Sequence, residues 1–292
     1  MNIPVILCAG GDARFVYTSE GLCSLGKVYS FGQEGYAGGS VMLGSLDIMP
    51  QKADMLVLPM LLGVGLDIAV SGGKSISCAE LSGHLNKNAL VVGGRLNTEV
   101  VEYFSSLGHD VIDYFVREEL VVRNCIPTAE GALLIAMQEL AVTIQGTRTL
   151  VIGFGRVAKA SAKAFSALGS SVSVAARRLS QLAQAENENY EAFYLGSLKE
   201  KADKFDVVIN TVPALILTKD ILERLQKDCL VIDLASKPGG TDFDEARQLN
   251  VRAVHALALP GKTAPKTSGE IIADAIKNIY YERRETNVFK GH

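Results

Sequence analysis

One segment, residues 147–178, constrains the fold of this chain more than any other. It reads TRTLVIGFGRVAKASAKAFSALGSSVSVAARR: a short apolar run, a glycine-rich turn, a helical stretch that ends at Gly169, and a second apolar run. A short, wholly apolar run is typical of a buried parallel strand, and two parallel strands need a crossover connection, usually a helix. The segment therefore predicts an α/β domain built on a parallel sheet.

The turn inside this segment has the small residues that a dinucleotide site needs. Gly153 permits a tight turn, Gly155 leaves room for a pyrophosphate against the backbone, and Ala158 lets the helix pack close to the strand. Such a turn can also be purely structural, but its place between a strand and a helix, whose first amides attract phosphates, favours cofactor binding. The predicted cofactor-binding residues of the turn are Gly153, Phe154, Gly155, Arg156 and Val157.

The residues that follow the second apolar run indicate which dinucleotide is bound. Proteins that bind NAD usually place an acidic residue there for the ribose hydroxyls. This chain has Ala175 and Ala176, and then Arg177 and Arg178. Guanidinium groups pair with a 2′-phosphate, which an acidic residue would repel, so we expect NADP rather than NAD. The alternative is that the two arginines form a solvated surface pair.

The composition of the chain argues against several other classes of protein. A net charge of −3, with no run of lysine or arginine, argues against a nucleic-acid partner. The apolar runs are too short for a membrane span and the first ten residues lack the basic start of a secretory signal, so we expect no membrane association and a cytoplasmic location. Five scattered cysteines without paired metal spacing indicate reduced thiols and no metal site.

The wider pattern indicates two domains, each long enough to hold its own core. Residues 1–125 are predicted to form an N-terminal α/β substrate and catalytic domain, and residues 147–264 a Rossmann domain that binds NADP. The candidate strands of the first domain are 5–8, 27–31, 55–58, 89–92 and 110–113, with a helix at 97–107. Further strands of the second domain are expected at 192–195, 207–210, 230–234 and 251–256. The fold class is therefore α/β, with two doubly wound parallel-sheet domains.

Two further helices are expected to connect and complete these domains. Residues 126–146 are predicted to form a crossing helix, with Pro127 in its first turn and Gly146 just past its end. Residues 265–285 carry isoleucine and alanine at helical spacing, which suits docking onto another apolar face. We expect this last helix to return to the first domain.

Polar and glycine-rich segments follow the predicted strands or start the predicted helices. Two-domain dehydrogenases place the nicotinamide in the cleft where such segments meet. The segments expected there are residues 10–14, 128–131, 210–213, and 233–240 together with 259–266. The cofactor-binding residues expected in them are Asn210, Thr211, Val212, Pro213 and Ala235.

Taken together, these segments resemble the A subunit of dipicolinate synthase from spore-forming bacteria. The resemblance runs over nearly the whole chain. The motifs that carry it are GGDAR at 10–14, IPTAEG at 126–131, GFGR at 153–156, INTVP at 209–213, DLASKPGGTDF at 233–243 and LPGKTAPKTSGE at 259–270.

The resemblance implies an activity, partners and a setting. It implies oxidation of a dihydrodipicolinate-level intermediate of the lysine pathway to pyridine-2,6-dicarboxylate, with NADP as hydride acceptor. It also implies the mother-cell cytoplasm during sporulation as the setting and, as a partner, a second, smaller, flavoprotein-like B subunit. A homo-oligomer is usual for this two-domain architecture.

The residues of the chain suit such a reaction. A substrate with two carboxylates needs cationic or amide-rich anchors, and aromatisation of a ring also needs a modest base. The predicted substrate-binding residues are Gly10, Gly11, Arg14, Thr128, Lys237 and Lys262. Asp12, Glu130 and Asp233 are the candidate catalytic carboxylates, of which Glu130 is favoured as the base or its organiser. Alternatively, Glu130 simply favours a helix dipole.

Two other functions stay open from the sequence. A 2-hydroxy-acid-type NADP dehydrogenase shares the two-domain architecture, although no histidine of this chain pairs evidently with a carboxylate. A noncatalytic NADP-binding scaffold that regulates a partner would keep the glycine turn and Arg177. It would not need Arg14, Glu130 or Lys237 facing a cleft.

Overall fold

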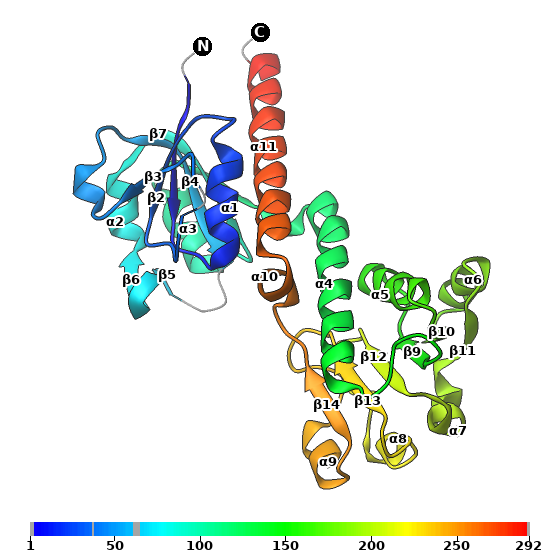
Figure 1. Cartoon of the computed structure of the whole chain (residues 1–292). Helices are drawn as coiled ribbons and strands as arrows, with labels where there is room; N and C mark the ends of the chain where they lie inside the picture. The colour runs from blue at the N-terminus through cyan, green and yellow to red at the C-terminus, as the bar shows by residue number, and fades with distance from the viewer. Residues whose placement is uncertain (1–2, 37, 61–64, 291–292) are drawn as a thin grey trace. The chain divides into compact units, whose positions relative to one another are not determined.

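The chain divides into two compact units, which are described separately below. The structure is a computed structural model that describes residues 3–36, 38–60 and 65–290, with side chains up to residue 285. Unit 1 comprises Met1–Asn124 and Ala264–His292, and unit 2 comprises Cys125–Thr263. Figure 1 shows the elements of both units along the chain.

Unit 1 is built on a parallel sheet with the strand order β3-β2-β1-β4-β7-β8. These strands are β1 (Val5–Ala9), β2 (Lys27–Phe31), β3 (Val41–Leu43), β4 (Ala53–Met60), β7 (Leu85–Gly94) and β8 (Asp110–Asp113). The helices of the first segment are α1 (Ala13–Leu22), α2 (Cys78–Gly83) and α3 (Thr98–Ser106), and an antiparallel hairpin joins β5 (Asp67–Val70) to β6 (Lys74–Ser77). All five predicted strands are present, whereas β3 and the hairpin were not predicted.

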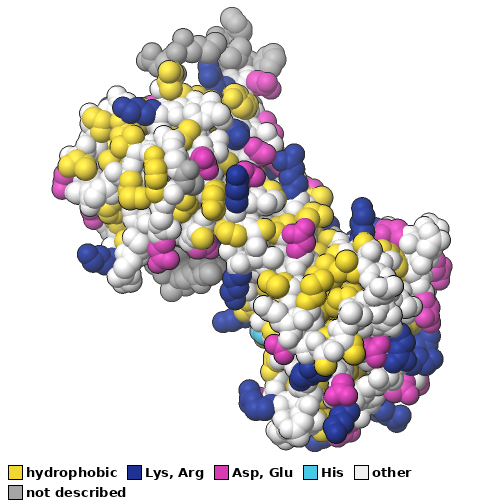
Figure 2. Space-filling view, viewed as in Figure 1, with side chains coloured by type: hydrophobic (Ala, Val, Ile, Leu, Met, Phe, Trp, Pro, Cys, Tyr) yellow, Lys and Arg dark blue, Asp and Glu magenta, His cyan; other side chains and the backbone are white. Residues whose placement is uncertain are grey.

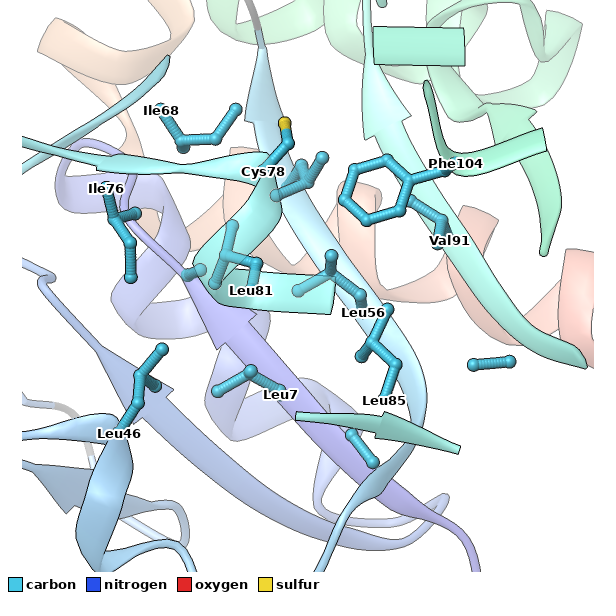
Figure 3. Close-up of a cluster of buried hydrophobic side chains, with 14 of the residues drawn as sticks. Leu7, Leu46, Leu56, Ile68, Ile76, Cys78, Leu81, Leu85, Val91 and Phe104 are labelled. Carbon is cyan, nitrogen blue, oxygen red and sulfur yellow. The ribbon is translucent and has the colours of Figure 1, made fainter. Parts of the chain in front are cut away.

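Successive residues of these strands pack on opposite faces of the sheet, because side chains alternate along a strand. On one face Leu7, Leu56 and Leu81 belong to an apolar cluster that α2 and α3 help to cover (Figure 3). On the other face Ile6 and Met55 contact a second cluster. Both faces of the sheet are therefore buried, as a doubly wound fold requires.

The C-terminal helix covers the second of these faces. Helix α11 (Pro265–Lys290) contributes Ile271, Ile272 and Ile276 to the apolar cluster of unit 1 and runs beside α1 (Figure 1). The two helices approach so closely that a Cβ on Gly269 would lie 2.3 Å from the carbonyl oxygen of Arg14. The predicted return of the last helix to the first domain is confirmed.

Unit 2 repeats this topology, with the strand order β11-β10-β9-β12-β13-β14 in a wholly parallel sheet. Its strands are β9 (Arg148–Ile152), β10 (Ser171–Ala176), β11 (Glu191–Tyr194), β12 (Val207–Asn210), β13 (Leu230–Asp233) and β14 (Arg252–His255). Its helices are α5 (Arg156–Ala167), α6 (Leu179–Asn187), α7 (Leu198–Lys201), α8 (Lys219–Leu222), α9 (Phe243–Gln248) and α10 (Leu259–Thr263). Numbered within each unit, both sheets have the order 3-2-1-4-5-6 of the dinucleotide-binding fold. The predicted fold class is confirmed.

The crossing helix is displaced from its predicted position. Helix α4 spans Glu118–Glu139 rather than residues 126–146, so Pro127 lies inside it and Gly146 lies beyond it in a loop. Glu118 and Glu119 suit a first turn because acidic side chains favour the positive end of the helix dipole. By length and composition α4 could also cross a membrane, but Ala132 and Ala136 belong to the core of unit 2.

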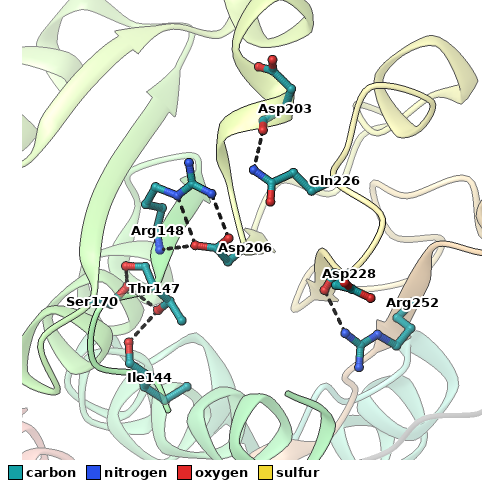
Figure 4. A network of polar contacts seen from close by, with 9 residues as sticks. All are labelled: Ile144, Thr147, Arg148, Ser170, Asp203, Asp206, Gln226, Asp228 and Arg252. Atoms are coloured by element: carbon teal, nitrogen blue, oxygen red, sulfur yellow. Dashed lines mark hydrogen bonds and ion pairs between the residues drawn. The ribbon is translucent and has the colours of Figure 1, made fainter. Parts of the chain in front are cut away.

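Polar contacts tie together the edge of the unit 2 sheet where the strands begin (Figure 4). Asp206 accepts hydrogen bonds from the backbone amide and the Nη2 of Arg148 at 2.8 and 3.0 Å. These bonds and the arginine charge hold the pKa of the Asp206 carboxyl below its usual value of 3.8. Beside them, the hydroxyl of Thr147 donates a hydrogen bond to the hydroxyl of Ser170 at 3.0 Å. This edge lies opposite the glycine turn, which follows the end of β9.

The cysteines are reduced, as the sequence predicts, and charges of both signs lie on the surface (Figure 2). All five cysteines are free thiols, and burial raises the pKa of both Cys8 and Cys229 to about 12. On the face shown in Figure 2, basic and acidic side chains are intermixed.

Short 3-10 turns complete the chain at Leu46–Ile48, Ser71–Gly73, Tyr114–Val116, Leu195–Ser197 and Ala202–Lys204.

Candidate functional site

The glycine turn of unit 2 has room for only a glycine at its first position. Gly153 has φ +90°, and a Cβ there would lie 2.8 Å from Thr211 Oγ1 and 3.0 Å from a methyl group of Val212. Its amide donates to the carbonyl of Ala175 at 2.8 Å. The turn is therefore fixed between β10 and the segment that follows β12.

The second glycine has the opposite environment. Gly155 is the N-cap of the twelve-residue helix α5, with φ −85°, and no atom lies within 4 Å of the position where a Cβ would stand. No side chain caps this end of the helix. Amides at a helix start attract anions, and Gly155 leaves space for a phosphate to approach them. The turn therefore fits a pyrophosphate.

The residues next to these glycines differ in how accessible their side chains are to a ligand. The Phe154 side chain is buried in the core, edge-on to Tyr190, so only its backbone is available to a ligand. Arg156 is exposed and Val157 is half-buried.

A cavity of about 200 Å³ opens beside the turn. It is lined by Gly153, Ala175, Ala176, Arg177, Arg178, Gln181, Leu195 and Val212. Ligand pockets for whole molecules usually measure about 300–1,000 Å³, so this one suits a single end of a dinucleotide. Gln181 and Leu195 were not among the predicted residues, although Gln181 lies only three residues beyond the second arginine.

The charge of this cavity is positive. Arg177 and Arg178 are exposed, and within the described part of the chain neither forms an ion pair. Helix α6 begins directly after them with no acidic residue in its first turn. Both features favour an anionic group at the end of β10.

The end of β12 adjoins the turn. Thr211 donates from its hydroxyl to the carbonyl of Ile152 at 2.8 Å, and Val212 lines the cavity. Asn210 is wholly buried, and Pro213 is exposed. Of these four predicted residues, the structure brings Thr211 and Val212 against the glycine turn.

Asp233, a predicted catalytic carboxylate, is wholly buried at the end of β13. It accepts hydrogen bonds from Asn210 Nδ2 and from the backbone amides of Ala235 and Gly240 at 2.9, 3.0 and 2.8 Å. Lys237 lies exposed on the loop between those two amides.

The predicted residues of α4 and α10 also belong to unit 2. A Cβ on Gly131 would lie 2.8 Å from both Leu259 Cβ and Thr263 Oγ1, so the two helices pack closely there. Glu130 and Lys262 are exposed and Thr128 is half-buried.

The remaining predicted residues belong to unit 1, in the turn between β1 and α1. Gly10 has φ +70°, and a Cβ on it would lie 2.3 Å from the carbonyl oxygen of Ala69. Asp12 caps α1 and accepts from the backbone amide, Nε and Nη2 of Arg14, the last at 2.7 Å. Gly11 follows Gly10 with φ +104°.

The Asp12–Arg14 pair sets the charge of this turn. Burial alone would raise the pKa of the Asp12 carboxyl, but the hydrogen bonds and charge of Arg14 hold it below its usual value. A carboxylate with a lowered pKa is a weak base, so this geometry favours Asp12 as the residue that orients Arg14. Arg14 is largely buried, with a side-chain exposure of 11%.

Comparison with known proteins agrees with the geometry of unit 2. Residues 126–248 match the family described as Alanine dehydrogenase/PNT, C-terminal domain. This match and the glycine turn identify unit 2 as a nicotinamide-dinucleotide-binding domain.

Relatives match the whole chain as well. The A subunit of dipicolinate synthase of Bacillus subtilis (strain 168) is 30% identical over 286 residues, which cover 95% of this chain and 96% of the relative. The crystal structure of the A subunit of dipicolinate synthase from Bacillus halodurans is similar with a TM-score of 0.84 and 31% identity, covering 94% of this chain and 97% of that chain. The crystal structure of the same dipicolinate synthase component from Bacillus subtilis gives a TM-score of 0.85 and 29% identity, with 98% of each chain covered.

The chain is thus an NAD(P)-dependent oxidoreductase. Over nearly its full length it matches A subunits of dipicolinate synthase, as its motifs predict. It belongs to the family of dipicolinate synthase A subunits.

Proposed function

We propose that this chain oxidises a dihydrodipicolinate-level intermediate of the lysine pathway to pyridine-2,6-dicarboxylate, with NADP as the hydride acceptor. The observation that carries the proposal is the full-length match to the A subunit of dipicolinate synthase, at 30% identity over 95% of the chain. Hydride acceptance is the chemistry that the nicotinamide supplies when bound. The protein has to bind the dicarboxylate, orient it and remove a proton.

The preference for NADP is supported by the cavity at the end of β10. Arg177 and Arg178 line it and form no ion pair within the described part of the chain, so both guanidinium groups are available to a 2′-phosphate. The residues that line the cavity include no acid to bind the ribose hydroxyls of NAD. Gln181 adds an amide donor to the same wall.

The double variant Arg177→Ala, Arg178→Ala tests this preference. Hydrogen bonds to charged groups contribute about 1.5–3 kcal/mol each, so NADP affinity should fall at least about 10-fold. NAD affinity should change less than about 2-fold, because NAD has no 2′-phosphate for these arginines to bind. Isothermal titration with each dinucleotide measures both values.

Arg247→Ala serves as a control for the loss of positive charge, because Arg247 is an exposed arginine of the same unit on α9. It should leave both affinities unchanged. An unchanged NADP-to-NAD ratio in the double variant would show that the arginines form a solvated surface pair.

The proposed anchors for the substrate carboxylates are cations, backbone amides and a hydroxyl group. Arg14 and the amides of Gly10 and Gly11 are the anchors proposed in unit 1, and Thr128, Lys237 and Lys262 those in unit 2. Each cation can pair with a carboxylate. Glu130, exposed on α4, is the proposed base or its organiser. Its exposure suits exchange of a proton with solvent.

A partner and a location are also proposed, on the basis of the resemblance to dipicolinate synthase A subunits. The Bacillus subtilis relative is named as one lettered subunit of its enzyme, which implies a partner subunit for that protein. We expect the corresponding partner here to be a smaller, flavoprotein-like B subunit, and the chain itself to form a homo-oligomer. The proposed setting is the mother-cell cytoplasm during sporulation.

A further inference from the structure

Asp233 joins three neighbouring strand ends of unit 2. It pairs in register with Asn210 on β12 and with His255 on β14. Asp233 and Asn210 are both wholly buried, and Asn210 Nδ2 donates to Asp233 Oδ1 at 2.9 Å. Buried polar groups of this kind are held strongly when every partner is present.

Asn210 links Asp233 to Val212 in the cavity wall through hydrogen bonds. Its Nδ2 donates to the carbonyl of Val212 at 3.1 Å, and its Oδ1 accepts from the amide of Val212 at 3.2 Å. Val212 lines the dinucleotide cavity, and a Cβ on Gly153 would lie 3.0 Å from its methyl group. The position of Val212 therefore depends on a side chain that Asp233 holds.

On its other side Asp233 fixes the loop of residues 235–240. Its Oδ1 accepts from the amide of Ala235 and its Oδ2 from the amide of Gly240. Gly240 is packed so tightly that a Cβ there would lie 2.3 Å from Asn210 Nδ2 and 2.6 Å from the carbonyl oxygen of Val212. The loop and the segment after β12 are thus interlocked.

The three partners of Asp233 are all N–H donors that have no lone pair to offer. They need both oxygens of the side chain as acceptors, which a carboxylate supplies and an amide does not. Asp233 is also wholly buried. Its surroundings suit a fixed acceptor better than a group that exchanges protons with a substrate.

We propose that Asp233 is a positioning residue for dinucleotide binding: through Asn210 it holds Val212 in the wall of the cavity, and it does not act as the catalytic base. The inference rests on dinucleotide binding by unit 2 but not on which dinucleotide is bound.

The variant Asp233→Asn tests the inference by changing one oxygen to an NH₂ group. At least one of the three donors then faces another donor. Isothermal titration should show NADP and NAD affinities that fall by the same factor, at least about 10-fold, because the cavity wall is shared by both. A common factor for the two dinucleotides separates this result from the arginine proposal, which concerns their ratio.

Asp206→Asn is the matched control. Asp206 directly precedes β12 and binds Arg148 at the edge where the strands of the sheet begin (Figure 4). Asp233, by contrast, is the last residue of β13. Asp206→Asn should lower the stability of the unit, measured by circular dichroism, while dinucleotide affinity stays unchanged.

A second variant keeps the test decisive if Asp233→Asn fails to fold. Asn210→Ala leaves the carboxylate with its two backbone donors and removes only the link to Val212. It should also lower the affinities for NADP and NAD by a common factor. In a folded double variant that combines Asp233→Asn with Asn210→Ala, the losses of binding free energy should be less than additive. Wild-type affinity for both dinucleotides in Asn210→Ala, or in a folded Asp233→Asn that has lost turnover, would overturn the inference.

Discussion

Substitution of alanine for each of the two glycines of the turn should have opposite effects: Gly153→Ala should lower mainly the stability of the protein, and Gly155→Ala mainly its affinity for the dinucleotide. In Gly153→Ala the new methyl group meets Thr211 Oγ1 at 2.8 Å and Val212 at 3.0 Å, at a backbone φ of +90°. A positive φ costs a residue with a Cβ about 1–2 kcal/mol, and overpacking adds about 1–3 kcal/mol. The free energy of unfolding should therefore fall by about 2–5 kcal/mol.

In Gly155→Ala the methyl group meets no atom within 4 Å, at a φ of −85°. Alanine is a poorer N-cap than glycine, but it also restricts the unfolded chain, so the free energy of unfolding should change by less than about 1 kcal/mol. The methyl group occupies the space through which the pyrophosphate would approach the helix. Dinucleotide affinity should fall at least about 10-fold, which corresponds to about 1.4 kcal/mol.

Two assays on each variant separate these effects. The chain has no tryptophan, so urea unfolding is followed by circular dichroism and dinucleotide binding by isothermal titration. If Gly155→Ala binds both dinucleotides like the wild type, the turn is not the pyrophosphate site. If it loses as much stability as Gly153→Ala, the described geometry of the turn is wrong.

Two further predictions concern the charged residues of each unit. Arg14→Ala should lower turnover, measured by product formation, at least about 10-fold, because a cation that pairs with a substrate carboxylate is lost. Dinucleotide affinity should stay unchanged, because Arg14 lies in unit 1 and the dinucleotide cavity in unit 2. Unchanged turnover would show that Arg14 does not belong to the substrate site. Asp206, whose pKa is lowered from 3.8 by Arg148, should stabilise the fold fully above that value and progressively less as the pH falls below it. The difference in unfolding free energy between wild type and Asp206→Asn should therefore shrink on acidification, and a difference that grows would contradict the ion pair.

Much of the fold could be predicted because the strands are short, apolar and bounded by polar or glycine-rich residues. The strands Lys27–Phe31, Asp110–Asp113 and Val207–Asn210 have the predicted bounds. The hairpin of β5 and β6 could not be predicted in this way, because it is fixed by distant contacts. The carbonyl oxygen of Ala69 in β5, for example, lies only 2.3 Å from where a Cβ on Gly10 would be.

The position of α4 shows where a local rule fails. Proline usually marks a first helical turn, since it removes a backbone donor and hinders the preceding turn. Here the helix continues through Pro127, and Ala132 and Ala136 pack in the core of unit 2. Tertiary packing outweighs the local preference.

The candidate site could be placed by sequence only to the level of strand ends. The motifs put Asp12 after one strand and Asp233 at the end of another, and catalytic groups of α/β enzymes lie at such strand ends. They could not show that Arg14 donates hydrogen bonds to Asp12, or that Asp233 is wholly buried and accepts hydrogen bonds from three N–H groups. Those features depend on side-chain geometry that spacing along the chain does not encode.

The most direct test of the account is the reaction itself. The purified chain, with and without a co-expressed B-type subunit, would be supplied with freshly made cyclic intermediate of the lysine pathway and either NADP or NAD. Ultraviolet absorbance would follow the pyridine dicarboxylate and the reduced cofactor together. The account predicts product with NADP in preference to NAD. Dinucleotide binding without product in any of these combinations would contradict the account and favour a noncatalytic scaffold or a different dehydrogenase substrate.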